Sequence, residues 1–193
     1  ADDSGGNIFM AEGASLIGRG SPDVDYLGGS LRICKGKADG DYGGNIFADN
    51  SSIDVQYANM DNGDADDGGG GLYLTNCDTV LDYISVGHGY AHHNEGGCIF
   101  VKGGTQCTIS NAVIFDGKAI KGSGIAAFST TLNVYGNTVI HDNKNHAANE
   151  KDSKGAGIYA IESTLHVGRE GFQDFIEIYN NECCDCGDAT AYG

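Results

Sequence analysis

A five-residue segment, Gly-Gly-Asn-Ile-Phe, occurs twice in this chain, at residues 5–9 and at residues 43–47. Looser versions recur further along, and each places an aliphatic residue directly after a glycine-rich corner. These segments are GGNIF, GGNIF, GGGLY, GGCIF, GSGIA and GAGIY, with Ile8, Ile46, Leu72, Ile99, Ile125 and Ile158 as the aliphatic residues. Their spacings are 38, 26, 27, 26 and 33 residues, so the basic period is 26 residues and the two longer intervals contain insertions. A fixed period of this length predicts a solenoid or another repeat architecture.

Each repeat contains three short segments in which apolar and polar residues alternate. In the fifth repeat, Ile125 opens the first segment, residues 132–134 form the second, and residues 139–141 form the third. A period of two predicts β-strands, and the Gly, Asn, Asp and Ser residues between the segments are typical of turns. A propeller blade needs four strands and about 40 residues or more, which these repeats do not provide. The pattern therefore predicts an all-β fold, a right-handed parallel β-helix of about six coils with three short strands each.

In a parallel β-helix, each strand pairs with its equivalent one coil further along the chain. We therefore expect the six aliphatic residues to form one internal ladder, and residues 1–193 to form a single domain. No capping segment is visible at either end, so we expect both terminal coils to be open. Such ends would stack head to tail on another copy or on the remainder of a longer chain. A glycine-rich β-sandwich is the alternative fold, although sandwiches rarely repeat so regularly.

The repeats resemble those of a known class of proteins. The segments GGGLYL, GGCIFV and GAGIYAIESTLHV are similar to repeats of pectin-lyase-like right-handed β-helix proteins. They also resemble the Gly-Gly-aliphatic repeats of polymorphic outer-membrane and autotransporter-type passengers. The resemblance covers nearly the whole chain and implies the β-helix fold, on which lyases, hydrolases, adhesins and inert stalks are all built.

The charge of the chain excludes several kinds of partner. Eleven Lys and Arg residues oppose 27 Asp and Glu residues, which gives a net charge of −16. Such a surface repels phosphate backbones, so we expect no nucleic-acid binding. No apolar run approaches about 18 residues, so we expect no membrane span. The 32 glycines and the single proline suit many tight corners and many paired strands.

The cysteines and the acidic composition are typical of an extracellular or cell-surface protein with some disulfides. Spacing does not give the connectivity, and an odd number of cysteines leaves at least one thiol without a partner in the chain. The disulfide candidates are Cys34, Cys77, Cys98, Cys107, Cys183, Cys184 and Cys186.

An acidic stretch before the third glycine-rich corner is a candidate calcium site, because hard divalent cations prefer oxygen ligands. Its carboxylates are Asp61, Asp64, Asp66 and Asp67. The stretch does not match an EF-hand, since the glycine is misplaced and no Glu stands at the twelfth position. The alternative is a solvated acidic surface that aids solubility.

One segment suggests catalysis. Residues 87–89 (Gly-His-Gly) are similar to the Gly-His-Gly of polygalacturonase-type glycoside hydrolases, and residues 76–78 faintly resemble their Asn-Thr-Asp. Inverting hydrolysis needs two carboxylates about 6.5–9.5 Å apart, and no convincing pair is apparent. Basic residues are too sparse for a polysaccharide lyase. We therefore assign no catalytic residue and interpret His88 as a turn residue.

Together these observations predict a non-catalytic extracellular structural or adhesive β-helix. It would be a filament subunit or part of a longer surface protein. Its insertions near residues 18–30, 58–69 and 168–175 would carry any recognition. The alternative is a carbohydrate-active enzyme of the same fold, either a polysaccharide lyase or a glycoside hydrolase, with carbohydrate as its partner.

Overall fold

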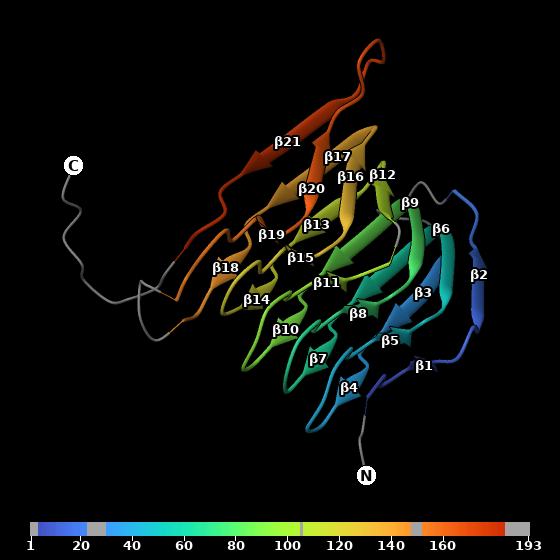
Figure 1. Cartoon of the computed structure of the whole chain (residues 1–193), viewed down its shortest axis with the longest axis vertical. Coiled ribbons are helices and arrows are strands. Elements are labelled where there is room, and N and C mark those ends of the chain that lie inside the picture. Colours follow the sequence, from blue (N-terminus) through green and yellow to red (C-terminus); the bar gives the residue numbers. More distant parts are fainter. Residues whose placement is uncertain (1–3, 23–29, 105, 148–151, 184–193) are drawn as a thin grey trace, which may run out of the picture.

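A computed structural model describes residues 4–22, 30–104, 106–147 and 152–183. Within these ranges every regular element is a β-strand, and the strands pair in parallel. Strands that are neighbours in a sheet lie one repeat apart in the sequence. The chain therefore winds as a parallel β-solenoid (Figure 1), as the repeat predicts.

The first sheet contains the strands that follow the glycine-rich corners. Its six strands, in spatial order, are β1 (Ile8–Met10), β5 (Ile46–Asp49), β8 (Leu72–Thr75), β11 (Ile99–Lys102), β15 (Ile125–Phe128) and β19 (Ile158–Ile161). The register pairs Ile8 with Ile46, Ile46 with Leu72, Leu72 with Ile99, Ile99 with Ile125 and Ile125 with Ile158. The six aliphatic residues of the repeat thus form one ladder. Its four inner members are completely buried.

The second sheet holds the next two strands of each coil. Its first limb is β2 (Ser15–Arg19), β12 (Cys107–Ser110), β16 (Thr131–Tyr135) and β20 (Thr164–Val167). Its second limb is β3 (Leu31–Cys34), β13 (Val113–Phe115), β17 (Asn137–His141) and β21 (Phe175–Tyr179). In two coils the limbs are continuous, as β6 (Ser52–Asp61) and β9 (Asp78–Gly87). These long strands bend at Tyr57 and Tyr83, whose φ angles are 54° and 50°.

The prediction of three strands per coil is incomplete, because a third sheet adds a fourth strand to five of the coils. Its strands are β4 (Lys37–Ala38), β7 (Asp64–Ala65), β10 (Tyr90–Ala91), β14 (Lys118–Ala119) and β18 (Lys144–Asn145). Two residues are too few to show alternation in a sequence.

The insertion expected near residues 58–69 is also wrong, since the end of β6 and all of β7 occupy this range.

The two glycines of the repeated segment have different roles. Gly43 has a φ of 70°, and a Cβ atom there would lie 2.4 Å from the carbonyl oxygen of Ile46. Gly44 lies against the next coil, where a Cβ atom would be 2.2 Å from the backbone nitrogen of Asp64. The first glycine therefore allows the left-handed corner, and the second allows two coils to approach closely.

Asparagines satisfy backbone groups inside the corner. Asn7 Nδ2 donates to Asn45 Oδ1 at 3.0 Å, and the same oxygen accepts the backbone N–H of Gly36 at 2.9 Å. At the other end of the solenoid, Asn143 Nδ2 donates to Asn181 Oδ1 at 2.9 Å. Asn45 and Asn143 are completely buried. Because a buried polar group without a partner is costly, these amides explain why Asn recurs at the corner.

Replacing a residue of the ladder should destabilise the solenoid strongly. We expect Ile99→Ala to lower the free energy of unfolding by about 2–5 kcal/mol, since it removes buried methyl groups and leaves a cavity. Lys102→Ala is the matched control, because Lys102 is exposed on the same strand and should change stability by about 0.5 kcal/mol or less. Urea unfolding followed by circular dichroism measures both. Equal effects of the two substitutions would contradict the ladder.

Candidate functional site

A groove runs along the outside of the solenoid, where the corner after the second sheet meets the third sheet. We call it the His88 groove, and its volume is about 420 Å³. It is lined by Asn62, Gly63, Asp64, His88, Gly89, Tyr90, Asp116 and Lys118. Residues from three successive coils therefore form its wall.

The Gly-His-Gly segment at this groove is explained by packing. The ring of Phe115 lies over Gly87, where a Cβ atom would be 2.4 Å from Phe115 Cζ. His88 occupies the left-handed corner with a φ of 50°, as do Asn62 and Asp116 in the neighbouring coils. A Cβ atom on Gly89 would lie 2.1 Å from the carbonyl oxygen of Gly97. His88 is a turn residue, and its flanking glycines are required by contacts between coils.

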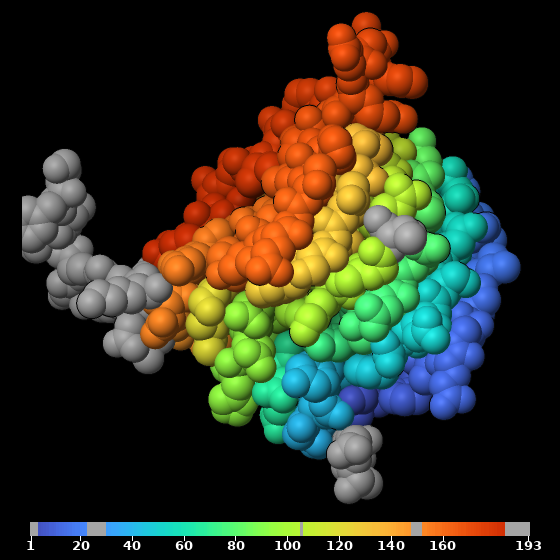
Figure 2. Space-filling view, in the orientation of Figure 1, coloured from blue at the N-terminus to red at the C-terminus, as the bar shows by residue number. Residues whose placement is uncertain are grey.

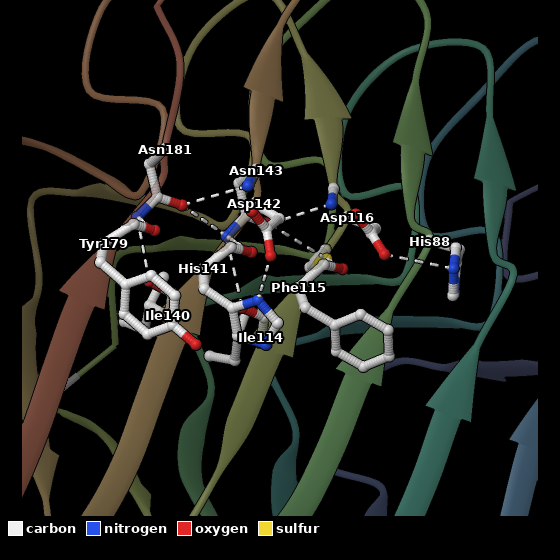
Figure 3. Close-up of polar contacts among 12 residues, drawn as sticks. His88, Ile114, Phe115, Asp116, Ile140, His141, Asp142, Asn143, Tyr179 and Asn181 are labelled. Atoms are coloured by element: carbon white, nitrogen blue, oxygen red, sulfur yellow. Dashed lines mark hydrogen bonds and ion pairs between the residues drawn. The ribbon is translucent and has the colours of Figure 1, made fainter.

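His88 lies between two carboxylates. Its Nδ1 is 2.7 Å from Asp61 Oδ1. Its Nε2 is 3.4 Å from Asp116 Oδ2 (Figure 3). The imidazole also meets the Phe115 ring edge to face, with 5.1 Å between the ring centroids. Because both nitrogens face carboxylates of neighbouring coils, the imidazole bridges three successive coils. Acid–base chemistry at His88 would require displacement of one of these partners.

A row of stacked rings continues from this point toward the end of the solenoid. The ring centroids of Phe115 and His141 are 5.7 Å apart, and those of His141 and Tyr179 are 5.3 Å apart (Figure 3). His141 Nδ1 also lies 2.6 Å from Asp142 Oδ2. These contacts link β13, β17 and β21 on their outer face. They stabilise the winding.

The structure does not assemble the predicted calcium site. Among the described residues, no group of three or more His, Cys, Asp or Glu side chains is arranged to hold a metal ion. Asp61 instead faces His88, and Asp64 Oδ1 lies 3.0 Å from His92 Nε2. Asp67 Oδ1 accepts a long hydrogen bond from Asn94 at 3.5 Å, and the backbone oxygen of Asp66 lies 2.8 Å from His93 Nδ1.

The partners of these aspartates carry a signal that composition alone misses. Each lies 27 or 28 residues further along the chain, which is the spacing of one coil. Pairs at the repeat period could therefore have been identified from the sequence. They show that the acidic stretch forms hydrogen bonds with His and Asn side chains of the next coil.

The disulfide prediction is wrong for the described cysteines, all of which are free. These are Cys34, Cys77, Cys98, Cys107 and Cys183; the other two candidates, Cys184 and Cys186, lie outside the described residues. Cys77, Cys98 and Cys107 are buried in the core, where the thiol acts as a small apolar group. Burial raises the pKa of Cys98 and of Cys107 to about 12.

The last described coil ends in an apolar surface, which we call the open coil (β19, β20 and β21). Leu165 is 41% exposed, whereas Leu132, its partner one coil earlier, is completely buried. Val167 is 47% exposed, and its partner Val134 is completely buried. The large exposed apolar side chains here are Ile161, Leu165, Val167, Phe172, Phe175, Ile178 and Tyr179. Figure 2 shows this coil, in orange and red, at one end of the molecule.

The first coil, in blue at the opposite end of the molecule in Figure 2, is less open. Its inward residues Met10 and Ile33 are only 7% and 8% exposed. The large exposed apolar residues of this coil are Phe9 and Ile17. They alternate with the inward residues of β1 and β2 and therefore lie on the outer faces of these strands. At these two positions the first coil is therefore less exposed than the open coil is at Leu165 and Val167.

An ion pair closes the loop between β20 and β21, which is one of the predicted recognition loops. Arg169 Nη2 donates to Asp174 Oδ1 at 2.7 Å, and the backbone N–H of Gly136 donates to the same oxygen at 3.0 Å. The guanidinium of Arg169 and these N–H donors lower the pKa of Asp174 to about 2. The loop is thereby fixed to the preceding coil.

No helix among the described residues is long and apolar enough to cross a membrane. Comparisons of the chain with models of protein families, with curated proteins and with solved structures found no match.

The buried thiols should resist chemical modification. At pH 8 we expect iodoacetamide to modify Cys34 and Cys183 in the folded protein, and Cys77, Cys98 and Cys107 only after unfolding in urea. Peptide mass spectrometry measures each site. The thiols of Cys98 and Cys107 ionise near the usual pKa of 9.0 in the unfolded chain, but only near pH 12 in the folded protein. The free energy of unfolding should therefore fall as the pH rises from 9 to about 12. Rapid modification of Cys98 in the folded state would disprove its core position.

The carboxyl group of Asp174 should titrate near pH 2 instead of its usual value of 3.8. Because its pKa is lowered on folding, its contribution to stability is present above pH 4 and is lost as the pH falls toward 2. Carbon-detected NMR of the carboxyl group measures the midpoint. Arg169→Gln should return the midpoint toward 3.8, whereas Glu170→Gln, a neighbouring control, should leave it unchanged. An unshifted midpoint in the wild type would refute the ion pair.

Proposed function

We propose that this protein is a non-catalytic structural or adhesive β-helix that extends by coil stacking. The open coil of one molecule would receive the first coil of the next, which makes the protein a filament subunit or a section of a longer surface protein. The observation that carries the proposal is the exposure of Leu165 and Val167, whose equivalents one coil earlier are completely buried.

The strand edges support the same proposal. β19, β20 and β21 are each the last strand of their row, so one side of each lacks a neighbouring strand among the described residues. Unpaired edges of this kind are ready templates for another chain. The first coil offers strands of similar length, since β1, β2 and β3 contain 3, 5 and 4 residues against 4, 4 and 5 in the open coil.

The finer assignment is a right-handed β-helix of the pectin-lyase-like type, with repeats similar to those of autotransporter-type passengers. An extracellular or cell-surface location is part of this proposal. It is supported by the net charge of −16 and by the resemblance of the repeats. The cysteines give it no support, because those described are unpaired.

The alternative, a carbohydrate-active enzyme, is favoured by one observation, the position of His88 between Asp61 and Asp116 in a groove. Both of its nitrogens are already occupied, so this arrangement is better suited to joining coils than to transferring protons. Hydrolysis of a polysaccharide that is abolished by His88→Gln in a normally folded protein would establish the alternative.

Stacking should depend on the apolar side chains of the open coil. We expect the wild type to form species larger than one chain in sedimentation velocity, increasingly so at higher concentration. Leu165→Lys with Val167→Lys should yield a folded monomer, because a buried ammonium is strongly disfavoured. His166→Lys is the matched control, since alternation places residue 166 on the opposite face of β20. Its assembly should match the wild type.

The result that would overturn the proposal is a wild-type protein that remains a single chain at every concentration. Electron microscopy of the assembled species provides an independent measurement, since coil stacking predicts unbranched fibres. Association that survives the double substitution would place the contact elsewhere on the molecule.

A further inference from the structure

Two rows of outward side chains carry opposite charges at the two ends of the solenoid. The first row lies on the second limb of the second sheet, where each residue pairs in register with its equivalent in the next coil. Its members are Arg32, Asn59, Ser85, Val113, Val139 and Glu177. The four inner members are uncharged, so the row begins with a cation in the first coil and ends with an anion in the open coil. Arg32 and Glu177 are both exposed.

The second row lies on the third sheet and has the same polarity. Its members are Lys37, Asp64, Tyr90, Lys118, Lys144 and Glu182. Lys144 Nζ lies 3.4 Å from Glu182 Oε2, and Lys37 Nζ lies 2.5 Å from Asp39 Oδ1. Both ion pairs are exposed, and exposed pairs are weak enough for a second partner to share them. Both rows therefore present a positive charge at the first coil and a negative charge at the open coil.

A hydrogen bond at the corner before the third sheet also points beyond the open coil. In three coils the backbone N–H at this corner donates to an asparagine oxygen one coil further along. Gly36 donates to Asn45 Oδ1 at 2.9 Å. Gly117 donates to Asn143 Oδ1 at 2.9 Å, and Asn143 donates to Asn181 Oδ1 at 3.1 Å (Figure 3). Asn181 holds the same position in the open coil, so its N–H faces the side where a further coil would lie.

The first coil offers the matching acceptor. Asn7 holds the position there that Asn45 holds in the second coil, since both follow the two glycines of the repeated segment. Asn7 Nδ2 donates to the carbonyl oxygen of Cys34 and to Asn45 Oδ1, each at 3.0 Å. Asn45 is completely buried, whereas Asn7 is exposed. A preceding coil would bury Asn7 in the same way and would supply the N–H of Asn181 to its Oδ1.

From these three matches we propose that the first coil of a second copy docks on the open coil in the continuing register of the solenoid. In this register Arg32 of the second copy lies beside Glu177, and Lys37 of the second copy lies beside Glu182. The inference rests on the proposed coil stacking and adds its partner, its direction and its register. Opposite charges on neighbouring strands attract and like charges repel, so the two rows favour head-to-tail contact over contact between two identical ends.

One position in this register carries like charges. Glu12 and Glu162 both occupy the left-handed corner after the first sheet, with φ angles of 58° and 50°, and would meet across the contact. Both are exposed, so water and salt screen their repulsion. Two pairs of opposite charge stand against this single pair, and the balance favours docking.

The test reverses charges at the two ends and measures association by sedimentation velocity. Glu177→Arg places like charges beside Arg32 of the next copy and should raise the dissociation constant of the contact by about tenfold. Arg32→Glu should have a similar effect, because it faces Glu177. Glu170→Arg is the matched control, since it makes the same charge change in the loop between β20 and β21, outside both rows. Its association should equal that of the wild type.

A mixture of the two variants provides the decisive measurement. The first coil of Arg32→Glu meets the open coil of Glu177→Arg with opposite charges, and the reverse contact retains the natural pair. An equimolar mixture should therefore recover the association of the wild type, which also shows that both variants are folded.

The register is overturned if Glu177→Arg associates as tightly as Glu170→Arg, or if the mixture associates no better than either variant alone. These outcomes would leave coil stacking intact and remove only its register. A wild type that remains a single chain at every concentration would overturn coil stacking and the register together.

Discussion

Parallel pairing of each strand with its equivalent one coil away is the constraint on which the rest of the structure depends. It places each residue beside the residue that holds the same position in the next coil, so side chains must be compatible with their own repeats. Inside, this requirement produces the ladder through Leu72 and Ile99. Outside, it stacks rings, with centroids 5.6 Å apart for Phe47 and Tyr73 and 4.6 Å apart for Tyr73 and Phe100. It also lets opposite charges meet, as in the ion pair between Lys121 Nζ and Glu95 Oε1 at 3.3 Å.

Features that recur at the repeat period could be predicted from the sequence, and features carried by single residues could not. The glycine corner and the ladder recur six times, so even loose copies such as Ile158 could be placed. The strand Lys118–Ala119 could not be recognised, because its pairing depends on the neighbouring coils and two residues show no pattern. The calcium prediction considered Asp64 only with its sequence neighbours, whereas its partner His92 comes from the next coil. Composition likewise gave no sign that Cys98 points into the core.

The ends of a solenoid differ from its middle for a thermodynamic reason. Each inner coil is stabilised by two interfaces, whereas a terminal coil has one, and the stability of the array is close to a sum of these terms. In the open coil, Ile178 is 46% exposed, although its partner Ile140 is completely buried. The apolar area that would be protected by one more coil is thus already arranged in the correct positions. Under the proposed stacking, an identical coil would match this surface better than an unrelated partner, because strand edges and side-chain rows must match together.

The third sheet shows how such a repetitive fold can still build a specific site. Its inward positions are nearly uniform, since Ala38, Ala65, Ala91 and Ala119 are all buried and only the last strand differs, with the buried Asn145. Its outward positions change from coil to coil through Lys37, Asp64, Tyr90, Lys118 and Lys144. Within one two-residue strand, therefore, the fold fixes one side chain and leaves the other free to vary. Variation at a position that repetition would otherwise keep constant is where recognition can arise.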